Sequence, residues 1–341
     1  MVSGRWGSSR DSANGHPCIF ATSDNGLTWH LRYDGYQNCT WDGLSGEIKG
    51  LTSTEVEPGK IIATALWVDR SDPDLPFINP RTQGLLPMRI MHVTSADFGF
   101  SWESPVPMDT TPHLAASPCS SHILRLPSGI LAQPYEQWKE YNDDRPGKPG
   151  ARLRFSEDGG QTWPKYVTVA QHPKNQIAYW DQRLSIEPNT GNIVAMFWTH
   201  NFRLQHDIDI HISYGSPDGQ IWTIPRNTTL PGQHCQPLCM GNNVLLAVYS
   251  RRRTSPAIVL SISRDLGKSW DHQEDLIIYD STQGPESGAE GSRTQSELWG
   301  DMEKWRFGHP RMVKLPNNEV FITYYGGTDS VQTARWARVG L

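Results

Sequence analysis

One eight-residue pattern, Ser/Thr-x-Asp-x-Gly-x-Ser/Thr-Trp, recurs along the chain and constrains its fold more than any other feature. Four copies are complete, and a fifth, SPDGQIW, is shortened. The copies are Thr22–Trp29, Ser95–Trp102, Ser156–Trp163, Ser263–Trp270 and the shortened Ser216–Trp222. A signature that returns every few tens of residues predicts a repeated supersecondary unit, because each such unit must bury its apolar face against the next.

The chemistry of this box predicts a tight turn. Its Asp can accept hydrogen bonds from backbone N–H groups just downstream, and its Gly, two residues later, supplies a positive φ. The closing Trp is large and apolar, and we expect it to fill the edge between neighbouring units. A single copy would be only a hairpin turn. The repetition predicts a structural role for every box rather than contact with a ligand.

A second recurring element, an apolar strand pair joined at a Gly or Asn turn, precedes the boxes. These hairpins are Leu51–Trp67, Ile123–Trp138, Leu184–Trp198, Gln236–Ser250 and Arg311–Tyr325. A third strand then leads into each box and a fourth leaves it. Four antiparallel strands per unit, repeated about six times, predict an all-β fold, a six-bladed β-propeller that occupies residues 1–341 as one domain.

The two ends of the chain depart from this repeat. The opening MVSGRW aligns with the end of a second strand, so the first blade is expected to be incomplete at the N-terminus and to lack its innermost strand. We favour a chain shortened by roughly one hairpin over an irregular closure of the ring. The last blade has a third strand, Val331–Val339, without a box. Ser296–Trp305 shows only weak helical periodicity and is expected to be a loop.

Composition excludes several classes of function. A net charge of −5 without a long basic run argues against nucleic-acid binding. No apolar stretch approaches the roughly 20 residues of a membrane span. The five cysteines have no C-x-x-C spacing, so we expect neither a disulfide framework nor a zinc site, and no cofactor. The acidic loop Asp69–Asp74 is read as solvated rather than as a calcium site.

Two further properties stay open. The N-terminal residues contain no apolar segment typical of a secretion signal, but a secreted or periplasmic location remains open if the start is truncated. The oligomeric state does not follow from the sequence.

The propeller geometry indicates which face carries chemistry. Starts of first strands and ends of second strands share one face, with the long loops, while the boxes lie on the other. First-strand starts on that face are Glu47, Lys49, His113, Asp181, Arg183, His234, Gln236, His309 and Arg311. Second-strand ends are Arg5, Arg10, Asp11, Asp69, Arg70, Glu136, Trp138, His200, Arg251–Arg253 and Tyr324–Tyr325. Carboxylates, arginines, histidines and aromatic rings together suit an anionic or sugar-like ligand, although any one of them could simply be solvated.

The boxes and hairpins together resemble the sialidase (neuraminidase) superfamily, also described as Asp-box or BNR-repeat proteins, from Arg5 to Leu341. The resemblance implies an acid/base Asp, a Tyr–Glu nucleophile and three arginines that hold the sialic carboxylate. Asp11 matches the acid/base position, and Arg251 or Arg252 matches the second arginine. Arg293 or Arg306 is a weaker match for the third arginine, and the first arginine belongs to the missing strand.

Two positions depart from that pattern. Where the family has Glu, this chain has GQHCQ, with His234 and Gln236, and where the family has Tyr it has FGHPR, with His309. Another nucleophile or another mechanism is therefore needed. His309 could act as base or nucleophile near neutral pH. Alternatively, Asp181 or Glu47 could activate water in an inverting scheme.

The sequence thus predicts a sialidase-like glycoside hydrolase, an exo-glycosidase acting on sialic acid or another acidic sugar, with a non-standard nucleophile. A propeller lyase on uronic-acid sugars, a non-catalytic carbohydrate-binding propeller and a scaffold for protein partners are the alternatives. The predicted catalytic residues are Asp11, His309, Asp181 and His234. The predicted substrate-binding residues are Arg10, Glu47, Arg70, Glu136, Trp138, Gln236, Arg251, Arg252 and Tyr325. A shared pocket for Asp11 and His309 favours an enzyme, whereas an Asp11–Arg10 ion pair on the outer rim favours a binding protein.

Overall fold

The computed structural model describes residues 1–8, 15–35, 39–118, 120–253, 255–281 and 294–340. Within these ranges the protein is built from six antiparallel sheets and one short α-helix. The prediction of an all-β, six-bladed propeller is therefore confirmed. The chain divides into two compact units, residues 1–125 with 129–166 and residues 126–128 with 167–341, which are described separately.

The first unit contains the early sheets. One sheet has three strands, in the order β1 (Val2–Trp6), β2 (His16–Ala21) and β3 (His30–Asp34). The next runs β4 (Cys39–Trp41), β5 (Leu44–Glu57), β6 (Lys60–Asp69), β7 (Met88–Ser95) and β8 (Val106–Pro107). The third runs β10 (Leu124–Arg125), β11 (Leu131–Gln137), β12 (Gly150–Ser156) and β13 (Lys165–Ala170), and β9 (Ala116–Pro118) also pairs with β11. Residues 167–170 of β13 are counted with the second unit.

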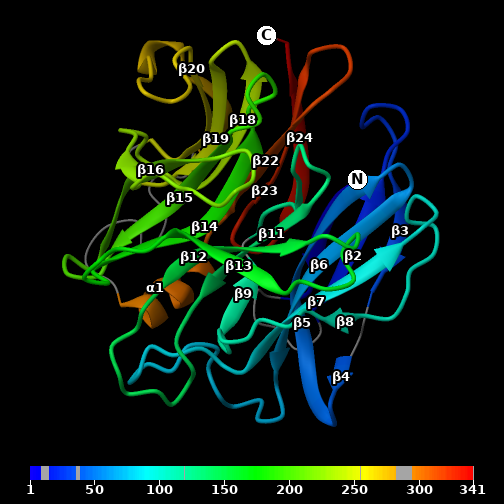
Figure 1. The fold of residues 1–341 in the computed structure, drawn as a ribbon, viewed down its shortest axis with the longest axis vertical. Helices are drawn as coiled ribbons and strands as arrows, with labels where there is room; N and C mark the ends of the chain where they lie inside the picture. The colour runs from blue at the N-terminus through cyan, green and yellow to red at the C-terminus, as the bar shows by residue number, and fades with distance from the viewer. Residues whose placement is uncertain (9–14, 36–38, 119, 254, 282–293, 341) are drawn as a thin grey trace. The chain divides into compact units, whose positions relative to one another are not determined.

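The second unit contains three sheets with the same up-and-down order (Figure 1). The first of these runs β14 (Ile177–Ile186), β15 (Ile193–Asn201), β16 (His206–Gly215) and β17 (Arg226–Asn227). The second runs β18 (Gln233–Gly241), β19 (Val244–Arg251), β20 (Ala257–Ser263) and β21 (Leu276–Asp280), with a 3-10 turn at His272–Glu274. The third has β22 (Phe307–Lys314), β23 (Val320–Gly327) and β24 (Gln332–Val339).

The box at Ser156–Trp163 shows how the repeated pattern forms a turn. The Ser156 hydroxyl donates to Asp158 and accepts from the Gly160 amide at 2.8 Å, while Asp158 accepts from the Thr162 amide and hydroxyl. The Trp163 indole donates to the Gly160 carbonyl at 3.2 Å. Gly160 has φ 93°, as the turn requires. The hydrogen bonds that Asp158 accepts hold the pKa of that carboxyl well below its usual range.

The box tryptophan also packs as the sequence predicts. Trp163 is buried in a cluster that contains Val56 and Ile62 from one sheet and Leu131 and Tyr135 from the next. The apolar ring therefore fills the space between two neighbouring blades of the first unit, where its burial stabilises both.

One local expectation was wrong. The segment expected to be a loop contains a helix, α1 (Gln295–Met302), drawn as the short orange coil in Figure 1. Thr294 caps it, and the Glu297 carboxylate accepts a hydrogen bond from the Thr294 amide, so a capping box starts the helix. Leu298 and Met302, four residues apart on one face, are buried. Capping and one apolar stripe compensate for the weak periodicity.

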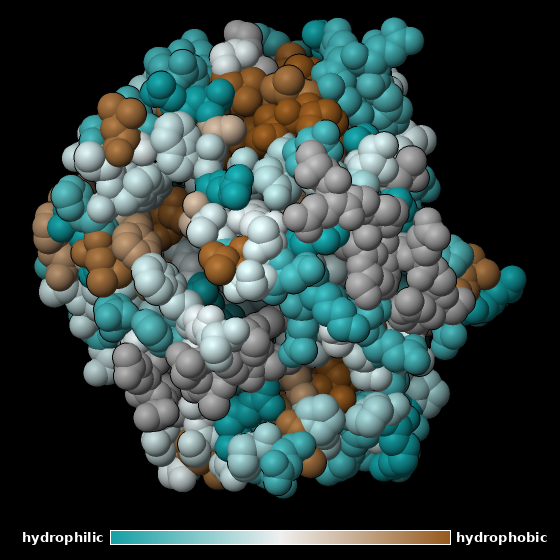
Figure 2. All heavy atoms as spheres, turned by 180° about the vertical axis from the view of Figure 1, so that it is seen from behind, coloured by the Kyte–Doolittle hydropathy of each residue, from teal (hydrophilic) through white to brown (hydrophobic). Residues whose placement is uncertain are grey.

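On the face that Figure 2 shows, hydrophobic residues form separate patches between hydrophilic ones. Among the described residues, no helix combines the length and apolar character that crossing a membrane would require.

Candidate functional site

The candidate site begins with an irregularity that three successive blades share. The register of the first strand shifts between Trp180 and Arg183 in β14, between Gln233 and Gln236 in β18, and between Gly308 and Arg311 in β22. Such a β-bulge re-aims a side chain out of the regular alternation of the strand.

Each bulge contains a residue in the left-handed region. The φ angles are 47° at Asp181, 47° at His234 and 48° at His309. A residue with a Cβ pays roughly 1–2 kcal/mol for that conformation. Strain of this kind persists where the surrounding structure imposes it, and it concentrates at functional sites.

The three strained residues meet in space. One ligand atom from each of Asp181, His234 and His309 lies within 4.8 Å of those of the other two. The His234 Nε2 is 3.7 Å from the Asp181 Oδ2, and the centres of the two imidazole rings are 4.1 Å apart. Three of the four predicted catalytic residues therefore form one cluster within the second unit.

A buried arginine organises this cluster. The Arg183 Nη2 donates to the Asp181 Oδ2 at 2.9 Å, and its Nη1 donates to the Pro310 carbonyl at 2.7 Å. The same Nη2 lies 3.4 Å from the His309 Nδ1. Because a guanidinium only donates, Nδ1 is the acceptor, and the neutral imidazole of His309 carries its proton on Nε2.

A second buried guanidinium makes the site cationic. Burial, and after it the positive charge of Arg183, lower the pKa of Arg311 to about 9, while Asp181 opposes that shift. The negative charge of Asp181 thus acts on two guanidinium groups. This charge balance suits a ligand that brings a negative charge of its own.

Two histidines and a carboxylate also raise the question of a metal ion. The donor set does not fit one, because Arg183 already occupies the Asp181 Oδ2 and faces the His309 Nδ1. A divalent cation would add two positive charges next to two buried guanidinium groups. We therefore interpret the cluster as a site for proton transfer and anion binding.

Aromatic rings line the side of His234. Its ring is 4.7 Å from that of Trp198 and 6.0 Å from that of Trp305. The Arg252 guanidinium stacks on Trp305 at 3.8 Å, a cation–π contact that fixes its plane. Tyr325 approaches His309 with ring centres 6.0 Å apart.

Buried hydrogen bonds connect Arg252 to the fourth blade. The Arg252 Nε donates to the Gln233 Oε1 at 2.8 Å, and the Gln233 amide donates to the Asp207 Oδ2. The other oxygen of Asp207 binds the His200 Nδ1 at 2.7 Å. The His200 ring stacks on Trp180 at 4.7 Å. Because these groups are buried, the network restrains both Arg252 and the strand that carries His234.

The first unit has a charged cluster around Glu47. Its carboxylate lies 2.6 Å from the Arg70 Nε, 3.0 Å from the Lys49 Nζ and 3.6 Å from the Arg5 Nη2. The predicted residues Glu47 and Arg70 are thus paired with each other. Also in this unit, the Trp138 indole donates to the Glu136 carboxylate at 2.9 Å.

The remaining predicted residues have other environments. Gln236 donates to the Pro237 carbonyl at 3.0 Å, and Arg251 to the Ser255 carbonyl at 3.0 Å, so both bind local backbone. Arg306 lies 3.7 Å from Asp329. The predicted residues that fall outside the described ranges are Arg10, Asp11 and Arg293.

Several residues of the site were not predicted to have a role in function. Arg183 and Arg311 had been placed on this face but given none, and Gln233, Asp207, Trp198 and Trp305 had not been linked to it. A signal was available in part: the three bulges read WDQR, QHCQ and GHPR, a polar residue followed two positions later by Arg or Gln. The partners of Arg252 leave no comparable pattern, because Gln233 comes from β18 and Trp305 from the segment before β22, far apart in the sequence.

Comparison with known proteins identifies the family of the chain. A family model described as the BNR repeat-like domain matches residues 65–322, well over half of the chain. The chain belongs to this family. The resemblance to BNR-repeat proteins is therefore confirmed. A search of curated proteins found no match.

Solved structures similar to this BNR repeat-like protein share its fold at low identity. A Dyadobacter fermentans protein of unknown function is 17% identical with a TM-score of 0.72, over 98% of this chain and 89% of that one. NanB sialidase from Streptococcus pneumoniae is 14% identical with a TM-score of 0.64, over 99% of this chain and 66% of its own. An α-L-arabinofuranosidase from Fusarium graminearum is 12% identical with a TM-score of 0.61, over 95% of this chain and 85% of that one. A Hadza microbial sialidase is covered over only 60% of its length.

Proposed function

We propose that this protein is a sialidase-like glycoside hydrolase that acts on sialic acid or another acidic sugar. The observation that supports this most is the meeting of Asp181, His234 and His309 at three strained bulges. Sialidases and an arabinofuranosidase among the structural neighbours agree with a sugar substrate. The surplus of buried guanidinium groups, Arg183 and Arg311, favours an acidic one.

Asp181 is the proposed proton acceptor. Its Oδ2 is held by Arg183, so the carboxylate is fixed in orientation. It takes a proton from a water molecule whose oxygen attacks the anomeric carbon while the glycosidic C–O bond breaks. In this inverting scheme a second carboxyl group protonates the leaving oxygen, and Asp11 is proposed for that role from the family resemblance.

The proposed role of the histidines is hydrogen bonding and positioning. His309 offers its Nε2–H as a hydrogen-bond donor to an oxygen that gains negative charge, because its Nδ1 faces Arg183. His234 lies 3.7 Å from Asp181 and restrains the carboxylate from the other side. Arg252, stacked on Trp305, is the proposed contact for the carboxylate of the substrate.

The test is hydrolysis of fluorogenic glycosides of sialic acid and of uronic acids. We expect turnover by the protein and a loss of about 10²–10⁴-fold in kcat/KM for Asp181→Asn and for His309→Asn. Asparagine suits both positions because it tolerates a positive φ.

His272→Asn is the matched control. His272 also lies beside a carboxylate, 3.3 Å from Asp275, but on an exposed 3-10 turn, and this variant should keep full activity. Absence of turnover for every acidic glycoside would refute the hydrolase. Binding of the same sugars without turnover would favour the carbohydrate-binding alternative.

A lyase acting on uronic-acid sugars is a second candidate. It is favoured by the replacement of the family's Glu and Tyr by His234 and His309, which suits proton removal next to a carboxylate. A histidine of this pair would take that proton, the bond to the leaving oxygen would break as that oxygen is protonated, and a carbon–carbon double bond would form. The ultraviolet absorbance of an unsaturated uronate in the product distinguishes this reaction from hydrolysis.

A further inference from the structure

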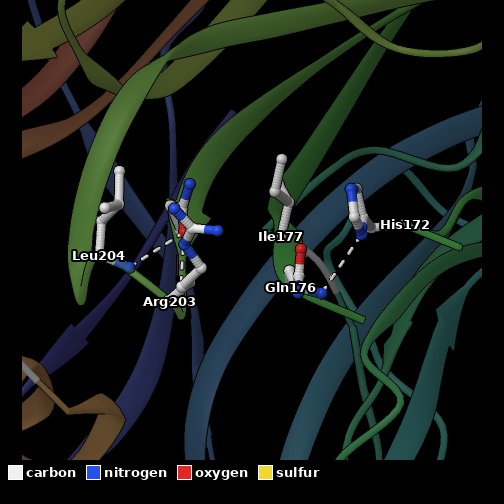
Figure 3. Close-up of a pocket in the computed structure, with 6 residues that line it drawn as sticks. His172, Gln176, Ile177, Arg203 and Leu204 are labelled. Atoms are coloured by element: carbon white, nitrogen blue, oxygen red, sulfur yellow. Dashed lines mark hydrogen bonds between the residues drawn. The ribbon is translucent and has the colours of Figure 1, made fainter. Parts of the chain in front are cut away.

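A cavity of about 220 Å³ opens where β14 begins and β15 ends, within the second unit. It is lined by His172, Gln176, Ile177, Asn201, Arg203 and Leu204 (Figure 3). We propose that this cavity is a second sugar-binding subsite, which holds the sugar next to the acidic one in a longer glycan. The proposal rests on the proposed function.

The polar groups of the cavity suit the oxygens of a sugar. The Asn201 Oδ1 accepts from the backbone amides of Arg203 and Leu204 at 3.0 and 3.1 Å. The His172 Nδ1 accepts from the amides of Lys174 and Gln176, both at 3.3 Å. These local bonds use the acceptor atoms. The Asn201 Nδ2, the His172 Nε2–H and the Arg203 guanidinium remain as donors for hydroxyl or carboxylate oxygens.

The two sides of the cavity also offer apolar contact. Figure 3 shows His172, Gln176 and Ile177 on one side and Arg203 and Leu204 on the other. Ile177 and Leu204 can pack against the C–H face of a sugar ring, as aliphatic side chains do in mixed polar and apolar sites. The volume exceeds that of a single water molecule several times, so it suits a sugar rather than an ion.

The cavity is held in a fixed shape. Ile177 pairs with Asn201 in the β14–β15 ladder, and the Phe202 amide donates to the Gln176 carbonyl at 2.9 Å, which ties the two loops together. His200, the residue before Asn201, is buried together with its partner Asp207. A preformed cavity reduces the entropy lost when a ligand is ordered.

The ladder also fixes the distance to the candidate site. The Trp180–Trp198 pair lies three residues along the same hairpin from the Ile177–Asn201 pair, which is about 10 Å at about 3.3 Å per residue. Trp198 contacts His234. A ligand that reaches from His234 to the cavity therefore needs more than one sugar ring.

The experiment compares short and long probes on the full chain. Methyl sialoside has only the acidic sugar, whereas sialyllactose has two further sugars, and a uronic acid methyl glycoside with its disaccharide forms a second pair. Dissociation constants are measured by calorimetry on Asp181→Asn, which slows hydrolysis during the titration. Adding Arg203→Ala or His172→Ala should weaken the longer probe of a pair about tenfold and leave the shorter one unchanged.

Lys174→Ala is the matched control, since Lys174 is an exposed cation of the same loop that does not line the cavity. It should change neither probe. Equal weakening of both probes, or no difference between long and short probes in either pair, would overturn the subsite. A subsite effect without hydrolysis by the unmodified protein would leave the subsite intact and refute only the hydrolase.

Discussion

The strain at the bulges can be measured by replacing His309 with glycine and with alanine. Both substitutions remove the imidazole, so they differ only in the Cβ that alanine retains. With φ at 48°, that Cβ lies in the left-handed region, where it costs about 1–2 kcal/mol, and glycine avoids this cost. Glycine also makes the unfolded chain more flexible, which disfavours folding by about 0.5–1 kcal/mol relative to alanine.

Val313 supplies the control for that second effect. It lies on the same strand, β22, with its side chain half-exposed and without a positive φ. Glycine at position 313 should be less stable than alanine by about 0.5–1 kcal/mol, as in an ordinary strand. The entropy cost of glycine in the unfolded chain is the same at both positions. The glycine–alanine difference at 309 minus that at 313 therefore isolates the strain, about 1–2 kcal/mol in favour of glycine.

The assay is equilibrium unfolding in urea for the four variants, with equal slopes against denaturant as the condition for comparing their free energies. The reasoning about the bulge is refuted if alanine is preferred over glycine at position 309 by the same amount as at position 313. Such a result would mean that the backbone at His309 is not held in the left-handed region.

Two further predictions concern pH and the buried network. Burial lowers the pKa of His92 from 6.5 to about 4. Between these pH values the unfolded chain binds more protons than the folded protein, so the free energy of unfolding falls as the pH falls. His92→Gln should reduce the slope of the unfolding free energy against pH, near pH 5, by up to about 1.4 kcal/mol per pH unit, measured by urea titrations. Asp207→Asn should lower the free energy of unfolding by about 2 kcal/mol, because one charge-assisted hydrogen bond to His200 or Gln233 is lost. It should also raise KM for an acidic glycoside more than it lowers kcat, because Arg252 is less restrained. An unchanged slope in the first case, or an unchanged KM in the second, contradicts the corresponding argument.

The repeated architecture could be predicted because the residues that form each turn and hairpin lie close together in the sequence. Ser156, Asp158, Gly160 and Trp163 interact within eight residues, so their spacing alone specifies the turn. The hairpins are equally local, and the predicted Leu184–Trp198 pair falls within β14 and β15. The helix α1 was missed because its stability comes from a cap at Thr294 and two buried side chains rather than from a long apolar stripe.

The candidate site was accessible to sequence reasoning only in part. The strand alternation places Asp181, His234 and His309 on one face, but it does not show that a bulge turns each of them toward the others. The pairing of Glu47 with Arg70 depends on two side chains meeting across a β-ladder, and no spacing rule specifies it. Tertiary geometry, which the sequence pattern does not encode locally, decides such partners.

The same bulge explains why function can change while the fold is retained. A first strand must stay apolar and regular to pack against its neighbours, yet the bulge frees one residue per blade from that requirement. Positions 181, 234 and 309 can therefore hold Asp or His here without altering the core beneath them. Two positions further on, Arg183 in β14 is buried and Arg311 in β22 is half-buried, and both add positive charge to the cluster. In the proposed function, substrate charge and proton transfer depend on a few residues at these bulges, whereas the boxes maintain the propeller.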